Sequence, residues 1–174
     1  MKQIATPLSH VFDLSDLGQA GAEVTVAAAA ELPELARWAG VDAVKRFCGE
    51  VRLRRLSQTH FAFEADLTAD IVQACVVTLE PVESRISRKI ARELHLAPQL
   101  PQDAGELTLA AGDDDVPETI LSLNYDLAVP LLEEFVLAID PYPRKAGVAF
   151  AAPAEPEMSP SSPFAVLKAL KDRD

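Results

Sequence analysis

The sequence predicts an α+β protein: a mainly antiparallel β-sheet, wound as a meander that could close into a barrel-like form, packed with two or three helices. Three observations predict this class. Apolar and polar residues alternate over residues 50–54 and 60–67, which is typical of strands with one buried and one wet face. The connections between successive strand-like runs are short, which favours a meander. Residues 31–38 and 126–138 carry apolar side chains at helical spacing.

A chain of 174 residues is long enough for one domain with its own core. We expect residues 1–147 to form a single α+β domain and residues 148–174 to form a Pro/Ala-rich linker followed by a short helix. Ser162 and Pro163 suit the start of that helix, and Phe164, Leu167 and Leu170 line one of its sides. Because a helix this short is marginal alone, it either docks on the domain or binds a partner through these three residues.

The sequence indicates a cytoplasmic protein with no membrane partner. No apolar run approaches the roughly 20 residues that cross a bilayer, and the N-terminus lacks the apolar region of a signal peptide. The two cysteines, Cys48 and Cys75, make no disulfide framework, which fits a reducing compartment.

Residues 70–81, which are largely apolar on both faces of an extended chain, are predicted to be a central strand covered on both sides, because β-branched residues dominate the stretch. Residues 10–14 and 22–28 are expected to pair as an outer hairpin. The helix over residues 31–38 has Pro33 in its first turn and ends at Gly40, and Trp38 is expected to anchor it on the sheet.

The second half of the sequence also predicts strands, a loop and a helix. Residues 82–96 fit either a long strand or a helix with a basic face, and the preceding meander favours the strand. Residues 97–116 indicate a loop, and residues 119–123 a strand. Asp126 is predicted to cap a helix that runs through Ala138, with an apolar stripe formed by Leu127, Leu131, Leu132, Phe135 and Val136.

Candidate catalytic and metal-binding residues are scarce, so we expect a protein that is not an enzyme and that uses no cofactor or metal. The three histidines and two cysteines show no zinc-ligand spacing, and no nucleophile motif or phosphate-binding glycine loop is present. Cys75 is expected to be a small buried apolar residue. The acidic run at residues 113–115 is interpreted as a solvated loop in preference to a magnesium site.

Basic residues concentrate in the middle of an acidic chain. The net charge is −11, which argues against binding a polyanion over the whole surface. Between residues 52 and 92, however, seven basic residues outnumber five acidic ones. A shared sheet face that contacts RNA phosphates is one hypothesis and a solvated basic face is the simpler alternative; the candidate RNA-binding residues are Arg52, Arg54, Arg85, Arg88, Lys89 and Arg92.

Three segments resemble the YceD family, the large ribosomal RNA subunit accumulation proteins of bacteria. The first is residues 73–81, Q-A-C-V-V-T-L-E-P. The second, within residues 125–147, is D-L-A-V-P-L-L-E-E-F-V-L-A-I-D-P-Y-P-R-K-A-G, and its D-P-Y-P-R-K is similar to α-proteobacterial-like members. The third is S-P-F-A-V-L-K-A-L-K, residues 162–171.

The resemblance implies a non-catalytic factor for 23S rRNA accumulation or processing and for large ribosomal subunit biogenesis. Its partners would be 23S rRNA or its precursor, or a ribosome-assembly or processing protein. Many relatives carry C-x-x-C-L-x-P, but Thr78 replaces the second cysteine here, so a metal role of those cysteines is not carried over. The alternative is a protein–protein adaptor that binds through its C-terminal helix without direct RNA contact.

Overall fold

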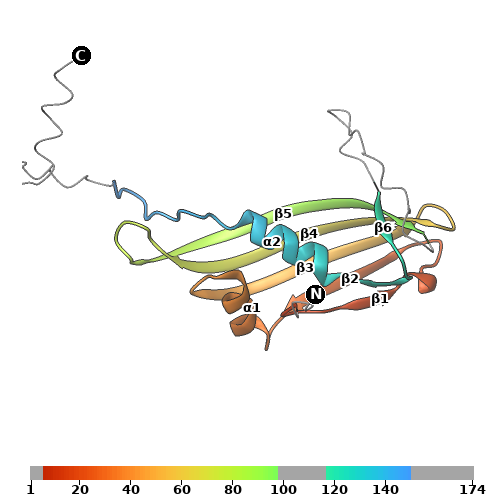
Figure 1. The fold of residues 1–174 in the computed structure, drawn as a ribbon, viewed down its shortest axis with the longest axis horizontal. Helices are drawn as coiled ribbons and strands as arrows, with labels where there is room; N and C mark the ends of the chain where they lie inside the picture. Colours follow the sequence, from red (N-terminus) through yellow and green to blue (C-terminus); the bar gives the residue numbers. More distant parts are fainter. Residues whose placement is uncertain (1–5, 98–116, 150–174) are drawn as a thin grey trace, which may run out of the picture.

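The computed structural model describes residues 6–97 and 117–149, which form an α+β fold (Figure 1). The elements in chain order are β1 Val11–Asp13, a 3-10 helix Leu14–Asp16, β2 Ala22–Ala28, α1 Leu32–Ala39, β3 Ala43–Arg55, β4 His60–Ala74, β5 Pro81–Leu96, β6 Glu118–Ile120, β7 Asn124–Asp126 and α2 Ala128–Ala138. One five-stranded sheet has the order β2-β3-β4-β5-β6, and β1 pairs with β7 in a separate two-stranded ribbon.

The predicted meander is confirmed. Strands β2, β3, β4 and β5 are consecutive antiparallel neighbours, and β6 then pairs with β5 in parallel. Phe61, Phe63 and Leu67 are fully buried on the side of β4 that carries the core. Residues 82–96 belong to strand β5, as favoured from the sequence, because β4 offers an antiparallel partner along the whole length of this segment.

The predicted central strand over residues 70–81 is wrong. Strand β4 ends at Ala74, residues 75–80 form the loop of the β4–β5 hairpin, and β5 begins at Pro81. The Cys75 N–H donates to the Glu80 carbonyl at 2.8 Å, which closes this loop. The apolar character of the stretch was therefore misleading, since Leu79 is 78% exposed.

The predicted hairpin of residues 10–14 and 22–28 is also wrong, although both segments contain strands. Strand β2 pairs with β3, whereas β1 pairs with β7, which lies more than a hundred residues further along the chain. The 3-10 helix that follows β1 turns the chain away, and its Leu14 N–H donates to the Leu123 carbonyl at 2.9 Å. Residues 119–123, predicted as a strand, are one only as far as Ile120.

Both predicted helices are present. Gly40 ends α1 in the left-handed conformation (φ 71°), and Leu35 and Ala36 bury its inner side. Trp38, expected as the anchor, is instead 37% exposed. The Asp126 carboxylate accepts from the Ala128 N–H at 3.0 Å, but the N-cap of α2 is Leu127, so the predicted cap residue lies one position before the cap.

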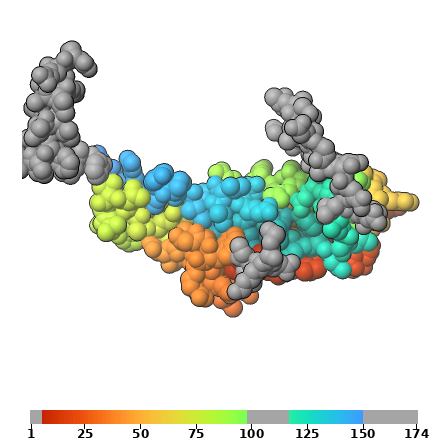
Figure 2. Space-filling model, viewed as in Figure 1, coloured from red at the N-terminus to blue at the C-terminus, as the bar shows by residue number. Residues whose placement is uncertain are grey.

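Helix α2 is seated closely on the sheet, and Figure 2 shows α1 and α2 over the same face of the molecule. Phe135 packs edge-on against Phe47 of β3, with ring centroids 5.4 Å apart. A Cβ at Gly49 would collide with the Leu131 side chain, so the absence of one lets the helix approach β3. Val136 does not join the predicted apolar stripe, because it points outward and is 42% exposed.

Several predictions lie outside the described residues: most of the loop at residues 97–116, and the linker and helix after residue 149. Within residues 6–97 and 117–149, no helix is long and apolar enough to cross a membrane.

Candidate functional site

The six candidate RNA-binding residues do not share one face, which corrects the sequence-based hypothesis. The face of the sheet opposite α2, here called the outer face, carries the even-numbered positions of β3 and β4 and the odd-numbered positions of β5. Arg52, Arg54, Arg85 and Lys89 therefore lie on the outer face. Arg88 and Arg92 have the parity of the buried Ile86 and Ile90, and lie on the side of the helices.

Carboxylates alternate with the basic residues on the outer face. Arg52 donates to Asp66 at 2.7 Å and Arg54 donates to Glu64 at 2.6 Å, both on β4. The hydrogen bond from Asp66 raises the pKa of Arg52. Arg85 lies 3.5 Å from Asp70 across the β4–β5 pair. The outer face is thus a lattice of cross-strand ion pairs instead of a basic surface, and such exposed pairs contribute little each.

Arg92 forms ion pairs within the fold. Its side chain is only 25% exposed, and its guanidinium lies 3.3 Å from Glu118 on β6 and 2.8 Å from Glu133 on α2. Burial lowers the pKa of Arg92, but the two carboxylates outweigh that effect and the pKa is raised. Glu118 also accepts from the Tyr125 hydroxyl at 3.2 Å, and burial raises the pKa of Tyr125. This network joins β5, β6, β7 and α2, so Arg92 is a poor candidate for binding RNA.

Besides Arg92, three of the six candidate residues lie on strand β5 along one edge of the sheet. Strand β6 pairs only with Leu94–Leu96, so among the described residues the rest of β5 has a neighbouring strand on one side only. Arg85, Arg88 and Lys89 lie on this stretch and are exposed. Within the described residues, Arg88 and Lys89 form no ion pair. These three residues, here called the β5 edge, are the part of the predicted basic surface that lies on a sheet edge.

A second feature is the end of the molecule formed by the β4–β5 loop, residues 75–80, and the segment after α2, residues 140–148; together they are called the hairpin tip. The Val76 N–H donates to the Pro143 carbonyl at 2.9 Å. Lys145 forms an ion pair with Glu80 at 3.0 Å, and this contact lowers the pKa of Glu80. The Gln73 side chain donates to the Asp140 carbonyl at 3.0 Å. The two segments are therefore braced as one unit.

Cys75 lies at the centre of the hairpin tip and is fully buried. The Thr78 hydroxyl, the Lys145 N–H and the N–H groups of Thr78 and Val77 donate to its sulfur, and they lower the pKa of the thiol to about 6. The Lys145 nitrogen is 3.4 Å from the sulfur. Hydrogen bonds to the charged form have this effect in general. The expectation that Cys75 is buried is confirmed, but its surroundings are polar on the side of the sulfur.

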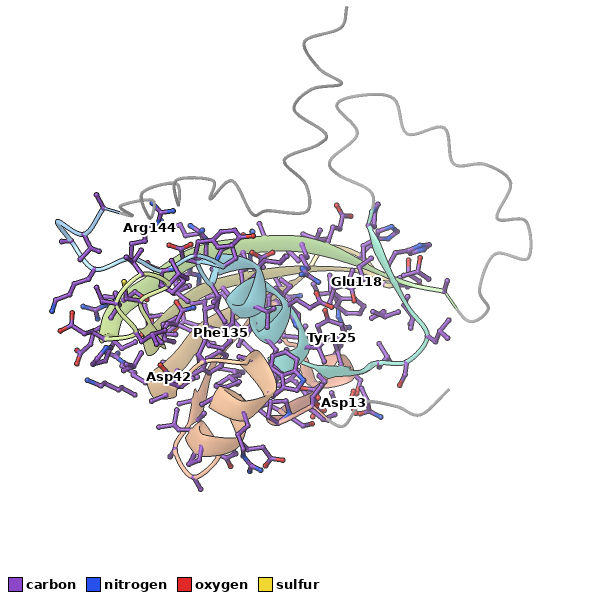
Figure 3. The ribbon with its side chains drawn as sticks, turned by 60° about the vertical axis from the view of Figure 1, so that its left-hand side comes forward. Asp13, Asp42, Glu118, Tyr125, Phe135 and Arg144 are labelled. Atoms are coloured by element: carbon purple, nitrogen blue, oxygen red, sulfur yellow. The ribbon has the colours of Figure 1, made fainter. Side chains whose placement is uncertain are left out.

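Three large apolar side chains are exposed on the hairpin tip, beside charged residues such as Glu80 and Lys145. Val76, Leu79 and Tyr142, here called the tip patch, are 46%, 78% and 70% exposed. Leu79 has a φ of 60°, and it is the one non-glycine residue with positive φ among the described residues. A left-handed conformation costs an L-residue roughly 1–2 kcal/mol. Figure 3 shows Arg144 at the end of the sheet away from Glu118.

The sequence-based reasoning missed the hairpin tip because it assigned residues 70–81 to a buried strand. The pair Glu80-Pro81 was the available signal, since proline lacks the N–H that a central strand needs and is confined to strand starts and edges. Lys145, the lysine of D-P-Y-P-R-K, carries no sequence signal that places it beside Cys75.

Among the described residues, no group of three His, Cys, Asp or Glu side chains is placed to hold a metal ion. The acidic run at residues 113–115 and the candidate partner-binding residues Phe164, Leu167 and Leu170 lie outside the described part of the chain. A comparison with family models, curated proteins and solved structures found no match for this chain.

Proposed function

We propose that this protein is a non-catalytic, cytoplasmic factor that supports 23S rRNA accumulation and assembly of the large ribosomal subunit. One observation carries the proposal. The segments that resemble the YceD family at residues 73–81 and 140–147 are far apart in sequence, yet they contact each other in the hairpin tip through Cys75, Val76 and Glu80. A chance resemblance gives no reason for the two segments to meet.

The test is the ratio of 23S to 16S rRNA in a strain that lacks the gene, with precursor ends mapped. We expect a selective loss of 23S rRNA, restored by the wild-type gene. A double variant of the hairpin tip, Leu79→Asp with Tyr142→Asp, is expected to restore it poorly, because it places charge on the tip patch. The control is Leu121→Asp, an exposed leucine (55%) on another part of the surface. An unchanged ratio in the deletion strain contradicts the proposal.

Direct RNA contact, where it occurs, is assigned to the β5 edge. Arg85, Arg88 and Lys89 are exposed on one strand within five residues, so phosphates approaching the edge can contact all three. Replacing them together with glutamine is expected to weaken RNA binding and to flatten its dependence on salt by about one unit of slope per lost phosphate contact. Arg37→Gln on α1 is the control. Equal salt slopes for the two proteins contradict the assignment.

A second candidate is a protein–protein adaptor that binds through its C-terminal helix, with Phe164, Leu167 and Leu170 as the contact residues. It is favoured by the ion-paired outer face and by the apolar tip patch, since neither attracts a polyanion. Salt separates the two candidates: phosphate contacts weaken steeply as salt rises, whereas an apolar helix in a groove does not.

A further inference from the structure

The tip patch is an apolar surface on a braced support. The Val76 N–H donates a hydrogen bond to the Pro143 carbonyl, and the Tyr142 N–H donates one to the Asp140 carboxylate at 2.9 Å, so both backbones are held in place. Leu79 stands between them in sequence, with most of its side chain exposed and its backbone in the left-handed region. A glycine would adopt this backbone without strain. This backbone conformation favours glycine, yet the chain has a leucine there, and its apolar side chain is exposed.

The chain leaves the domain beside this patch. The Lys145 N–H contacts the Cys75 sulfur, and the Val148 N–H then donates to the Lys145 carbonyl in a turn that contains Gly147 at φ 81°. Figure 1 shows the described chain ending at the same end of the sheet as the β4–β5 hairpin. Everything after residue 149 is thus attached within a few residues of the tip patch.

The segment attached there carries a complementary apolar stripe. Its sequence predicts a helix that begins at Ser162-Pro163 and presents Phe164, Leu167 and Leu170 on one side. A helix this short needs an apolar surface to be stable in water. The 14 residues from 150 to 163 include four prolines, and at the roughly 3 Å per residue of an extended Pro-rich chain they reach about 40 Å at most, so the stripe is tethered within that distance of the domain.

We propose that the tip patch is the docking site of the chain's own C-terminal helix, which seats Phe164, Leu167 and Leu170 on Val76, Leu79 and Tyr142. Because the helix is tethered to the domain, its docking is intramolecular, so a small contact is enough to hold it. The docking is a property of the isolated protein and does not depend on the proposed role in rRNA accumulation.

The test is residue-resolved hydrogen exchange on the full-length protein, together with the NMR shifts of Val76, Leu79 and Tyr142. Two variants each remove one side of the contact: Leu79→Gly, which keeps the loop backbone unstrained, and Phe164→Ala. Leu121→Gly makes the same chemical change at an exposed leucine away from the tip. Both contact variants are expected to reduce the protection of residues 164–171 by about tenfold, as expected for losing one large apolar contact, and Leu121→Gly to leave it unchanged.

Three results overturn the proposal. The first is a wild-type protein whose residues 164–171 exchange as fast as an unstructured peptide. The second is protection that Leu79→Gly and Leu121→Gly change equally, which places the helix elsewhere on the domain. The third is protection that rises with protein concentration, because the docked helix then comes from a second copy of the protein.

Discussion

Removing the Arg92 guanidinium should destabilise the fold, although the same residue looks like part of a basic surface in the sequence. The change we consider is Arg92→Gln. It removes the donors 2.8 Å from Glu133 and 3.3 Å from Glu118, and leaves these carboxylates close to each other without a cation between them. The matched control is Arg88→Gln, which lies four residues away on the same strand and on the same side of the sheet.

The size of the effect follows from exposure. A hydrogen bond to a charged partner contributes about 1.5–3 kcal/mol when buried, and an exposed ion pair about 0.2–1 kcal/mol. The Arg92 side chain is 25% exposed, but Glu133 and Glu118 are 52% and 38% exposed, so solvent screens both pairs. We therefore take about 0.5–1 kcal/mol for each contact and expect Arg92→Gln to lower the free energy of unfolding by about 1–2 kcal/mol. Arg88→Gln should change it by less than about 0.5 kcal/mol.

Urea unfolding of the full-length protein measures both values, with the midpoint and the slope fitted separately. A lower midpoint at constant slope is expected for Arg92→Gln. Glu133→Gln should cost less when Arg92 is already glutamine, because the two changes remove the same contact. If Arg92→Gln and Arg88→Gln unfold at the same urea concentration, the network does not stabilise the fold and the reasoning is wrong.

Three further predictions concern the turns and the hairpin tip. Gly21→Ala should lower the free energy of unfolding by about 2–3 kcal/mol in urea unfolding, because φ is 79° there and a Cβ would collide with the Leu53 carbonyl oxygen; Gly18→Ala, with open space around it, should have almost no effect. In a Cys48→Ser background, the ultraviolet absorbance of the Cys75 thiolate should titrate near pH 6. Since the pKa is lower in the folded protein, stability should rise from about pH 6 to 9 and be lost as pH falls through 6, and a flat profile contradicts this. Leu79→Gly should melt no lower than wild type, because the relief of backbone strain offsets the entropy of glycine in the unfolded chain.

The parts of the fold that follow from burial on one face could be predicted from the sequence. The alternation through Val51, Leu53, Phe61 and Phe63 fixes which side of β3 and β4 is inside, because a slip of one residue would expose the whole set. The pairing of β1 with β7 could not be predicted. Each is only three residues long, and their register depends on contacts made elsewhere, such as Asp126 accepting from the His10 N–H.

The candidate site was predicted less well, for two physical reasons. Exposed apolar residues at the hairpin tip have the composition of a buried strand, so Val76 and Leu79 were interpreted as interior. The basic residues of β5 are assigned to one surface in the sequence-based hypothesis, although the sequence leaves open whether this segment is a helix or a strand. Once it is a strand, Arg88 shares the parity of the buried Ile86 and Ile90, whereas Lys89 lies on the other face.

This parity also decides how a basic surface on this protein can be tested. A charge reversal that includes Arg92 would weaken RNA binding even where RNA never touches this residue. Three carboxylates, at Glu118, Glu133 and Glu134, would face a fourth negative charge, and β5 would lose its ion pairs with α2. The loss would be indistinguishable from a lost phosphate contact in a binding assay alone. Changes restricted to Arg88 and Lys89 of the β5 edge avoid this confusion, because these two residues have no carboxylate partner within the described residues, whereas Arg85 pairs with Asp70. A loss of binding in such a protein, at unchanged stability, is then attributable to the contact itself.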